Sequence, residues 1–175
     1  MLTKASRSYF HRTIINGHGA GRNIAASACH FAGVCDECAR KPWLHLPACA
    51  SNLVLFSRTG HYPAIEAERF WHDARRKYPN AQFIGLDHEY ADFERLFGGI
   101  QRFATATLWD AAIAIASCTH LVTDQSPQLA IAHGLQKSVT VSVACEHRDC
   151  IFLRPSAEYP FVDESSLREY GIVCI

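Results

Sequence analysis

Short polar residues connect an apolar run to an expected helix in the second half of the chain. Asp124, Gln125 and Ser126 form this connection, and Pro127 then begins a run rich in small residues. Serine is a favoured N-cap residue and proline suits the first helical position, so we expect a helix from Pro127 onward. A strand that leads into a helix in this way presents free backbone N–H groups, and phosphates commonly bind there. The segment therefore predicts binding of a phosphorylated ligand, such as a nucleotide-sugar.

The same pattern, a polar group just after an expected strand, occurs at three earlier places. Ligands of an open parallel sheet bind beyond the carboxyl ends of its strands, so these groups would share one site. Arg58 could neutralise a phosphate, and Glu89 or Asp87 could accept a hydrogen bond from a ribose hydroxyl. The alternative is that these residues only form loops and helix caps. The predicted ligand-binding residues are Arg58, Thr59, Gly85, Glu89, Thr107, Asp124, Gln125 and Ser126.

Eight cysteines are the other residues that could do chemistry. Cys29 together with the Cys35-x-x-Cys38 pair could begin a zinc site, but no second such pair completes it. An expected helix at 22–39 favours small buried thiols over metal ligands. We interpret 145–150, which holds two cysteines and a histidine, as a polar loop. Reduced thiols are therefore expected, with neither a metal nor a cofactor.

Alternating strand and helix patterns position these residues from about residue 50 onward. Short apolar runs separated by helices are typical of a parallel sheet with helices on both faces, so we predict an α/β fold. We divide the chain into an N-terminal extension and linker at 1–50, a main domain at 51–150, and a tail at 151–175 packed on that domain. The expected strands are 52–57, 81–86, 101–104, 120–123 and 138–143, and the expected helices are 64–78, 88–97, 108–117, 127–135 and 164–170.

Composition excludes several other classes of protein. With 175 residues and a hydrophobic fraction of 49%, the chain can bury a substantial core, which excludes a disordered protein. The 17 basic and 17 acidic residues cancel, so no broad nucleic-acid interface is expected. The sequence has no apolar run of transmembrane length and no apolar core of a signal peptide near its beginning. We therefore expect a cytoplasmic protein.

Four motifs within 52–143 together resemble a known domain. They are Leu55-Phe56-Ser57-Arg58-Thr59, Phe83-Ile84-Gly85-Leu86 followed by Glu89, Leu108 to Ala116 before Cys118, and Asp124-Gln125-Ser126 with Leu129 to Leu135. This set resembles the C-terminal, donor-binding domain of GT-B glycosyltransferases, especially heptosyltransferase-like proteins. The resemblance implies a Rossmann-like, three-layer parallel sheet with a short N-terminal extension. It also places the last motif at the donor site, facing the diphosphate of a nucleotide-sugar.

The resemblance implies a protein that binds an ADP- or UDP-linked sugar and transfers the sugar to a glycan or lipid-linked acceptor. GT-B enzymes have two such domains, and the acceptor and catalytic base usually lie on the first. Only about 50 residues precede the donor-type domain here, which is too few for a domain of usual size. In addition, Gln125 and Ser126 replace the small hydroxyl–glycine pair of heptosyltransferases.

The catalytic residues are therefore unknown, and Asp36, Glu37 and His18 are candidate bases only by default. An enzyme is the favoured interpretation. The alternative is a non-catalytic nucleotide-sugar binding module, or a subunit whose partner chain supplies the N-terminal half.

Overall fold

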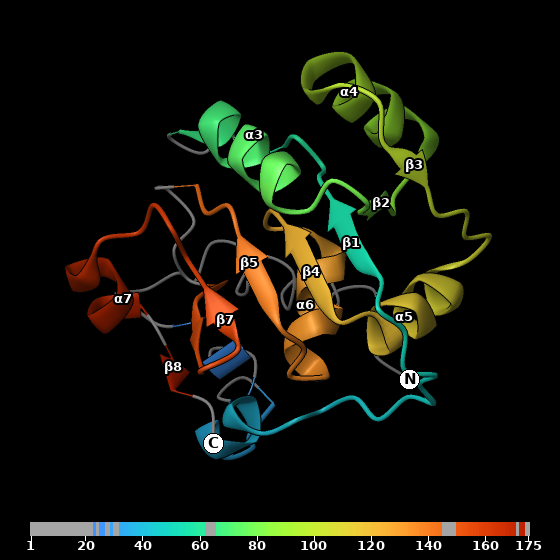
Figure 1. Ribbon diagram of the computed structural model, residues 1–175. Coiled ribbons are helices and arrows are strands. Elements are labelled where there is room, and N and C mark those ends of the chain that lie inside the picture. The colour runs from blue at the N-terminus through green and yellow to red at the C-terminus, as the bar shows by residue number, and fades with distance from the viewer. Residues whose placement is uncertain are drawn as a thin grey trace, which may run out of the picture.

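Six parallel strands form the central sheet of the computed structural model, which describes residues 23, 25, 26, 29, 32–61, 66–144, 150–170 and 172–173 (Figure 1). The strand order across the sheet is β3-β2-β1-β4-β5-β7. The strands are β1 (Val54–Ser57), β2 (Gln82–Phe83), β3 (Gln101–Arg102), β4 (His120–Thr123), β5 (Val139–Val141) and β7 (Ala157–Glu158).

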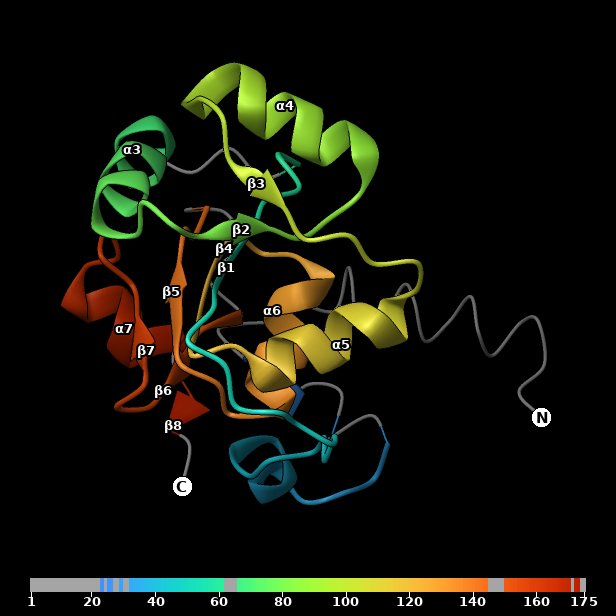
Figure 2. The same ribbon diagram turned by 45° about the vertical axis from the view of Figure 1, so that its right-hand side comes forward.

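Helices cover both faces of this sheet, which gives three layers (Figure 2). Successive residues of a strand point to opposite faces. Phe56 therefore packs in one cluster with α3 (Ala67–Lys77) and α4 (Asp87–Phe97), whereas Leu55 packs in another with α5 (Leu108–Ser117) and α6 (Pro127–Gly134). The predicted α/β, Rossmann-like parallel sheet is confirmed.

The order of the strands reverses beside β1. The chain runs outward from β1 through β2 to β3, and then returns to place β4 on the other side of β1. The register pairs Val54 with His120 and Ser57 with Thr123, so both strands end at the same level. Open α/β sheets bind ligands at such a reversal, in the crevice beyond the carboxyl ends of the strands. The residues that follow β1 and β4 are consequently neighbours at this point.

The C-terminal region contributes strands that the sequence pattern did not predict. β7 pairs in parallel with β5, and a separate two-stranded parallel sheet joins β6 (Phe152–Leu153) to β8 (Ile172–Val173). Each of these strands is only two residues long, so none contains a detectable alternation of apolar and polar residues. The expected helix at 164–170 is present as α7 (Glu164–Tyr170).

The expected helix at 22–39 is wrong for its second half. Residues 32–35 form a turn and an irregular segment, and a short 3-10 helix, η1 (Asp36–Arg40), follows. Gly33 lies in the left-handed region with φ of 69°, which ends a helix and which residues other than glycine rarely adopt. Ala25, Ala26 and Cys29 are helical.

The segment after η1 attaches to the C-terminal end of α6. The backbone N–H groups of Trp43 and Leu44 both donate to the Gly134 carbonyl oxygen at 3.0 Å. A Cβ atom at position 134 would lie 2.6 Å from Trp43 Nε1 and 2.8 Å from Leu44 Cδ1, so this contact requires glycine.

Within the described residues, no helix has both the length and the apolar character needed to cross a membrane. The predicted polar loop at 145–149 and the candidate base His18 lie outside those residues.

We expect Phe93→Ala to lower the free energy of unfolding by about 3–5 kcal/mol, because the cavity is not refilled. The Phe93 ring is fully buried and lies 5.3 Å from Trp71, 5.1 Å from Phe83 and 6.1 Å from Phe56, measured between ring centroids. Chemical denaturation measures the loss. Leu96→Ala on the same helix is the control, since Leu96 is 41% exposed and its loss should change stability by about 0.5 kcal/mol or less. Equal losses would contradict the placement of α4.

Candidate functional site

A buried carboxylate joins the loops that follow β1 and β4. Asp124 Oδ2 accepts hydrogen bonds from the Thr59 backbone N–H at 2.8 Å, the Gly60 backbone N–H at 3.2 Å and the Thr59 hydroxyl at 3.1 Å. Asp124 is 4% exposed. The structure thus brings two of the predicted site residues, Thr59 and Asp124, into direct contact at the strand-order reversal. Asp124 uses this oxygen to hold the loop, not to present it outward.

The other oxygen of this carboxylate is free to accept a hydrogen bond. Among the described residues, Asp124 Oδ1 is buried without a hydrogen-bond partner. Burial raises the pKa of Asp124 above its ordinary value, although the hydrogen bonds from Thr59 and Gly60 act in the opposite direction. An unpaired buried oxygen is costly, so Asp124 Oδ1 is the point where a ligand hydroxyl or a water would be most stabilising.

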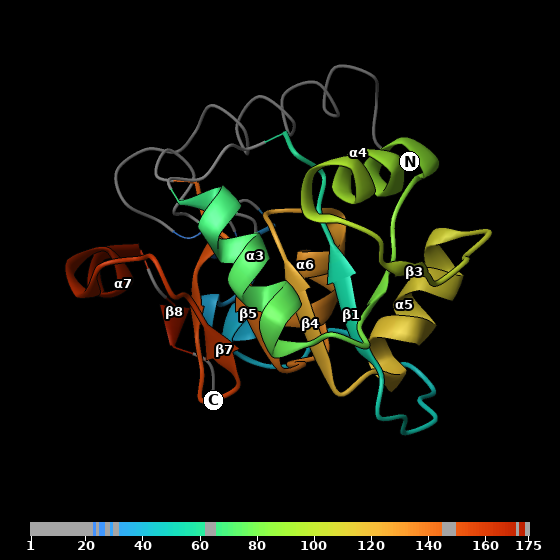
Figure 3. The same cartoon turned by 45° about the horizontal axis from the view of Figure 1, so that its top comes forward.

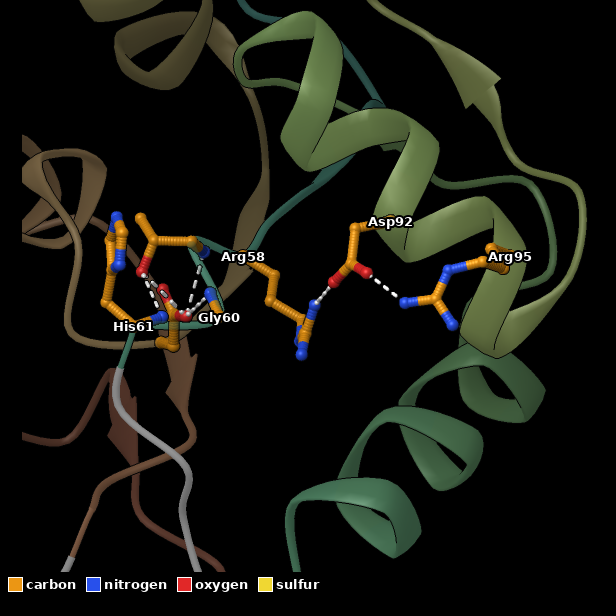
Figure 4. Close-up of polar contacts among 7 residues, drawn as sticks. Arg58, Gly60, His61, Asp92 and Arg95 are labelled. Carbon is orange, nitrogen blue, oxygen red and sulfur yellow. Dashed lines mark hydrogen bonds and ion pairs between the residues drawn. The ribbon is translucent and has the colours of Figure 1, made fainter.

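Arg58 reaches from the same loop toward α4 (Figure 4). Its guanidinium contacts Asp92 at 2.5 Å and lies over the Phe97 ring, 5.5 Å from the centroid. A Cβ atom at Gly60 would be 3.3 Å from both terminal nitrogens of Arg58. The hydrogen bond from Arg58 lowers the pKa of Asp92, which keeps that carboxylate charged. Arg58 is therefore a positioned cation beside the reversal, with its side chain 17% exposed.

Helix α6 begins at Pro127, shortly after Asp124 in the chain. The Ser126 hydroxyl accepts from the Leu129 backbone N–H at 3.4 Å and bonds the Thr123 hydroxyl at 2.9 Å. Ser126 is therefore the N-cap that the sequence predicts, and Pro127 occupies the first turn. The start of α6 points to the same edge of the sheet as the loop that carries Arg58 (Figure 3). A helix N-terminus and an arginine at one edge form an arrangement suited to an anion.

Gln125 contacts residues that follow β5. Its Oε1 accepts from the Ala144 backbone N–H at 2.8 Å, and its Nε2 donates to Cys150 Sγ at 3.0 Å. The side chain thus ties the start of α6 to the segments on either side of 145–149. Its contacts are structural, while its role in binding a donor stays a prediction.

A cavity of about 470 Å³ opens at the carboxyl ends of β2 and β3, next to the reversal. Gly85 and Thr107, both predicted site residues, lie in its wall. Among the described residues, Gln128 Oε1 in the same wall is buried without a hydrogen-bond partner. Its lining also includes Asp87 and Arg102.

The predicted residues beside this cavity shape it mainly by capping helices. Glu89 Oε2 accepts from the Leu86 backbone N–H at 2.8 Å at the start of α4. A Cβ atom at Gly85 would lie 2.8 Å from that same oxygen and 2.8 Å from Cε1 of the buried Phe83 ring, so a larger residue would displace these contacts. Thr107 is the N-cap of α5, and its hydroxyl accepts from the Asp110 backbone N–H at 3.1 Å and donates to the Asp110 carboxylate at 2.8 Å.

Sequence reasoning missed Arg102 and Gln128. Arg102 lies within β3, where a side chain is expected to pack against the sheet, yet it reaches the cavity and pairs with Asp87. Gln128 is the second residue of α6, so its position in the predicted phosphate-binding motif was a signal that could have identified it.

The cysteines do not assemble a metal site in the part of the chain that the structure describes. No three His, Cys, Asp or Glu side chains come together there. Cys35 and Cys38 are exposed, Cys118 is buried, and Cys29 is half-buried. Glu37, a default candidate for the catalytic base, is exposed on η1, which packs against β8.

We expect Asp124→Ala to lower the free energy of unfolding by about 2 kcal/mol or more, because partly buried N–H donors lose their acceptor. Asp124→Asn retains an acceptor oxygen and should cost less. Urea denaturation at pH 7 measures both variants. Equal losses would show that the acceptor oxygen does not hold the loop.

A comparison of wild type with Asp124→Asn tests the raised pKa of Asp124. A raised pKa means that the folded state binds the proton more tightly than the unfolded chain does, so stability falls as pH rises through the folded-state pKa. Wild type should therefore gain stability relative to Asp124→Asn as pH falls from about 7 to about 4. Denaturation curves at several pH values measure this difference, and a difference independent of pH would contradict it.

The chain was compared with protein families, curated proteins and solved structures. No family model matches the chain, and no curated protein matches it. The chain is similar to the E. coli heptosyltransferase WaaC, solved with ADP-2-deoxy-2-fluoro heptose, with 16% sequence identity and a TM-score of 0.45. The match covers 87% of this chain and 42% of that chain. The chain thus spans less than half the length of that heptosyltransferase.

Proposed function

We propose that this protein binds a nucleotide-diphosphate sugar, ADP- or UDP-linked, and transfers the sugar to a glycan or lipid-linked acceptor. One observation carries the proposal. Arg58, in the loop after β1, and the N-terminus of α6, which follows β4, lie at the same edge of the sheet (Figure 3), and α6 contributes Gln128 to the wall of a cavity of about 470 Å³. The positive charge of Arg58 and the backbone N–H groups at the start of α6 suit a diphosphate. The cavity has a volume that suits a nucleoside.

The diphosphate would lie between the two loops at the reversal. Arg58 would supply the positive charge, and the first turn of α6 would supply backbone N–H donors. Asp124 would fix the position of the loop that carries Arg58, since it already accepts two hydrogen bonds from Thr59 and one from Gly60. Binding would draw Arg58 partly from Asp92 to the more highly charged ligand.

The nucleoside would occupy the neighbouring cavity. Gly85 would line its wall, and Glu89 holds the loop before α4 in place. Gln128 Oε1 would accept a hydrogen bond from an amino or hydroxyl group of the nucleoside. Thr107 caps the helix that forms the opposite wall.

Transfer would be a direct displacement at the anomeric carbon of the sugar. The acceptor oxygen forms a bond to that carbon while the bond to the diphosphate breaks, and the acceptor proton passes to a base. Arg58 and the start of α6 would stabilise the negative charge that develops on the departing diphosphate. We assign no residue as the base.

A non-catalytic binding module, or a subunit that requires a partner chain, is the second candidate function. The observation that favours it is that the acidic residues at this edge already take part in ion pairs or hydrogen bonds. Asp92 pairs with Arg58, Asp87 pairs with Arg102, and Asp124 and Glu89 accept hydrogen bonds from the backbone. A partner that supplies the acceptor site would also have to supply the base.

Replacing Arg58 tests the diphosphate site. We expect Arg58→Ala to weaken the binding of an ADP- or UDP-sugar by roughly tenfold to a hundredfold, because a charge-assisted contact to the diphosphate is lost. Isothermal titration calorimetry with ADP, UDP and their sugar derivatives measures this change. Arg95→Ala is the matched control, since Arg95 also pairs with Asp92 but is 67% exposed on the far side of it (Figure 4). Absence of heat with every nucleotide would contradict both candidate functions.

Release of free nucleotide separates the enzyme from the binding module. The purified chain should release ADP or UDP from the donor that it binds when an acceptor is present. Binding without release, combined with release after addition of a partner chain, would favour the second candidate.

A further inference from the structure

We propose that Cys35 and Cys38 form a redox-active thiol pair that exchanges with a low-molecular-weight disulfide and closes a bond between their sulfurs. This proposal goes beyond the nucleotide site and does not depend on it. The pair lies on and just before η1, drawn in blue below the sheet, whereas the proposed donor site lies at the carboxyl ends of the strands (Figure 2).

The backbone between the two cysteines has the geometry that a disulfide needs. The Cys38 N–H donates to the Cys35 carbonyl oxygen at 2.9 Å, which closes a four-residue turn. A turn closed in this way holds its terminal Cα atoms within about 7 Å, and a disulfide spans about 4.4–6.8 Å between Cα atoms. The two Cα atoms are therefore close enough for a disulfide to bridge them without unfolding the turn.

Both thiols are accessible, which distinguishes them from the nearest other cysteine. Cys35 and Cys38 are exposed, whereas Cys29 is half-buried and packs against the cluster formed by Ala39 and Phe152. An incoming disulfide can thus reach the pair from solvent. Access and thiolate character decide which cysteines react.

Cys35 is the sulfur that attacks first. It is the N-cap residue of η1, and its Sγ accepts from the Glu37 backbone N–H at 3.5 Å. This contact holds the Cys35 sulfur in place at the exposed start of η1, where an incoming disulfide can reach it. No such bond is formed to Cys38 among the described residues, so Cys38 is the resolving thiol.

The exchange takes place in two balanced steps. The Cys35 thiolate attacks one sulfur of a small disulfide such as oxidised glutathione, forms a mixed disulfide and releases one thiolate. The Cys38 thiolate then attacks the Cys35 sulfur, forms the Cys35–Cys38 bond and releases the second thiolate. Two electrons pass from the pair to the small disulfide, which is reduced to two thiols.

Anchoring of η1 keeps the turn in a shape suited to closure. Ala39 is 2% exposed and packs against Phe152 of β6. Gln136 Nε2 donates to the Arg40 carbonyl oxygen at 3.2 Å, and Trp43 and Leu44 bond to Gly134 just beyond. Since the chain is fixed immediately after the pair, little additional ordering is required when the sulfurs join.

Thiol trapping in buffers of reduced and oxidised glutathione tests the proposal. Free thiols of the purified full chain are alkylated with one reagent, disulfides are reduced, and the released thiols are alkylated with a second reagent before peptide sequencing by mass spectrometry. We expect Cys35 and Cys38 to carry the second label together, with a loss of about 2 Da before reduction. Exposed Cys49 and buried Cys118 provide the internal comparison.

Single replacements identify the attacking and resolving thiols. In Cys38→Ser, the mixed disulfide at Cys35 should persist roughly tenfold longer or more, because no neighbouring thiol resolves it. In Cys35→Ser, the remaining Cys38 thiol should react with glutathione disulfide no faster than Cys49 does. Cys49→Ser should leave formation of the Cys35–Cys38 bond unchanged. Circular dichroism checks that each variant is folded. The proposal is overturned if the two cysteines take up glutathione separately, if Cys29 joins either of them, or if both remain reduced under conditions that oxidise Cys49.

Discussion

The centre of this structure depends on one buried carboxylate and the hydrogen bonds that it accepts. Asp124 follows β4, and its Oδ2 holds the backbone of Thr59 and Gly60, which follow β1. A buried acceptor with matched donors is favourable, while the same donors without it would be costly. The contact therefore fixes the relative position of the two loops, and through Thr59 it also fixes where Arg58 begins.

Parallel pairing makes that contact possible. β1 and β4 are distant in sequence, but four residue pairs, from Val54–His120 to Ser57–Thr123, place their ends at one level. The helices on each face then complete the frame, with aromatic packing around Phe56 and Phe93 on one side and small residues of α5 and α6 on the other. A rigid sheet with loops at one edge is a common way to hold ligand-binding groups at fixed distances.

The same frame explains why most predicted site residues have structural contacts. Ser126 and Thr107 cap helices, Glu89 holds the loop before α4, and Gln125 bonds to Ala144. Such contacts are what keep the loops in place, and in the proposed function they leave Arg58, the start of α6 and the cavity beside Gln128 to bind the ligand. In the proposed function, the residues that cap and the residues that bind are adjacent and mutually dependent. The chain would hold the donor, and the origin of the catalytic base is the main difference between the two candidate functions.

The amino-acid sequence by itself determined the alternation of strands and helices between about residues 50 and 143, and hence the parallel α/β sheet. It also determined that Ser126 and Pro127 begin a helix, because capping depends on neighbouring residues alone. Only the tertiary structure decided that Asp124 binds Thr59, that Gln125 is turned toward Ala144, and that Arg102 reaches the cavity. It likewise decided that 157–158 adds a sixth strand. These features arise from contacts between residues far apart in the chain, and local periodicity carries no information about which distant partner a polar side chain or a two-residue strand will meet.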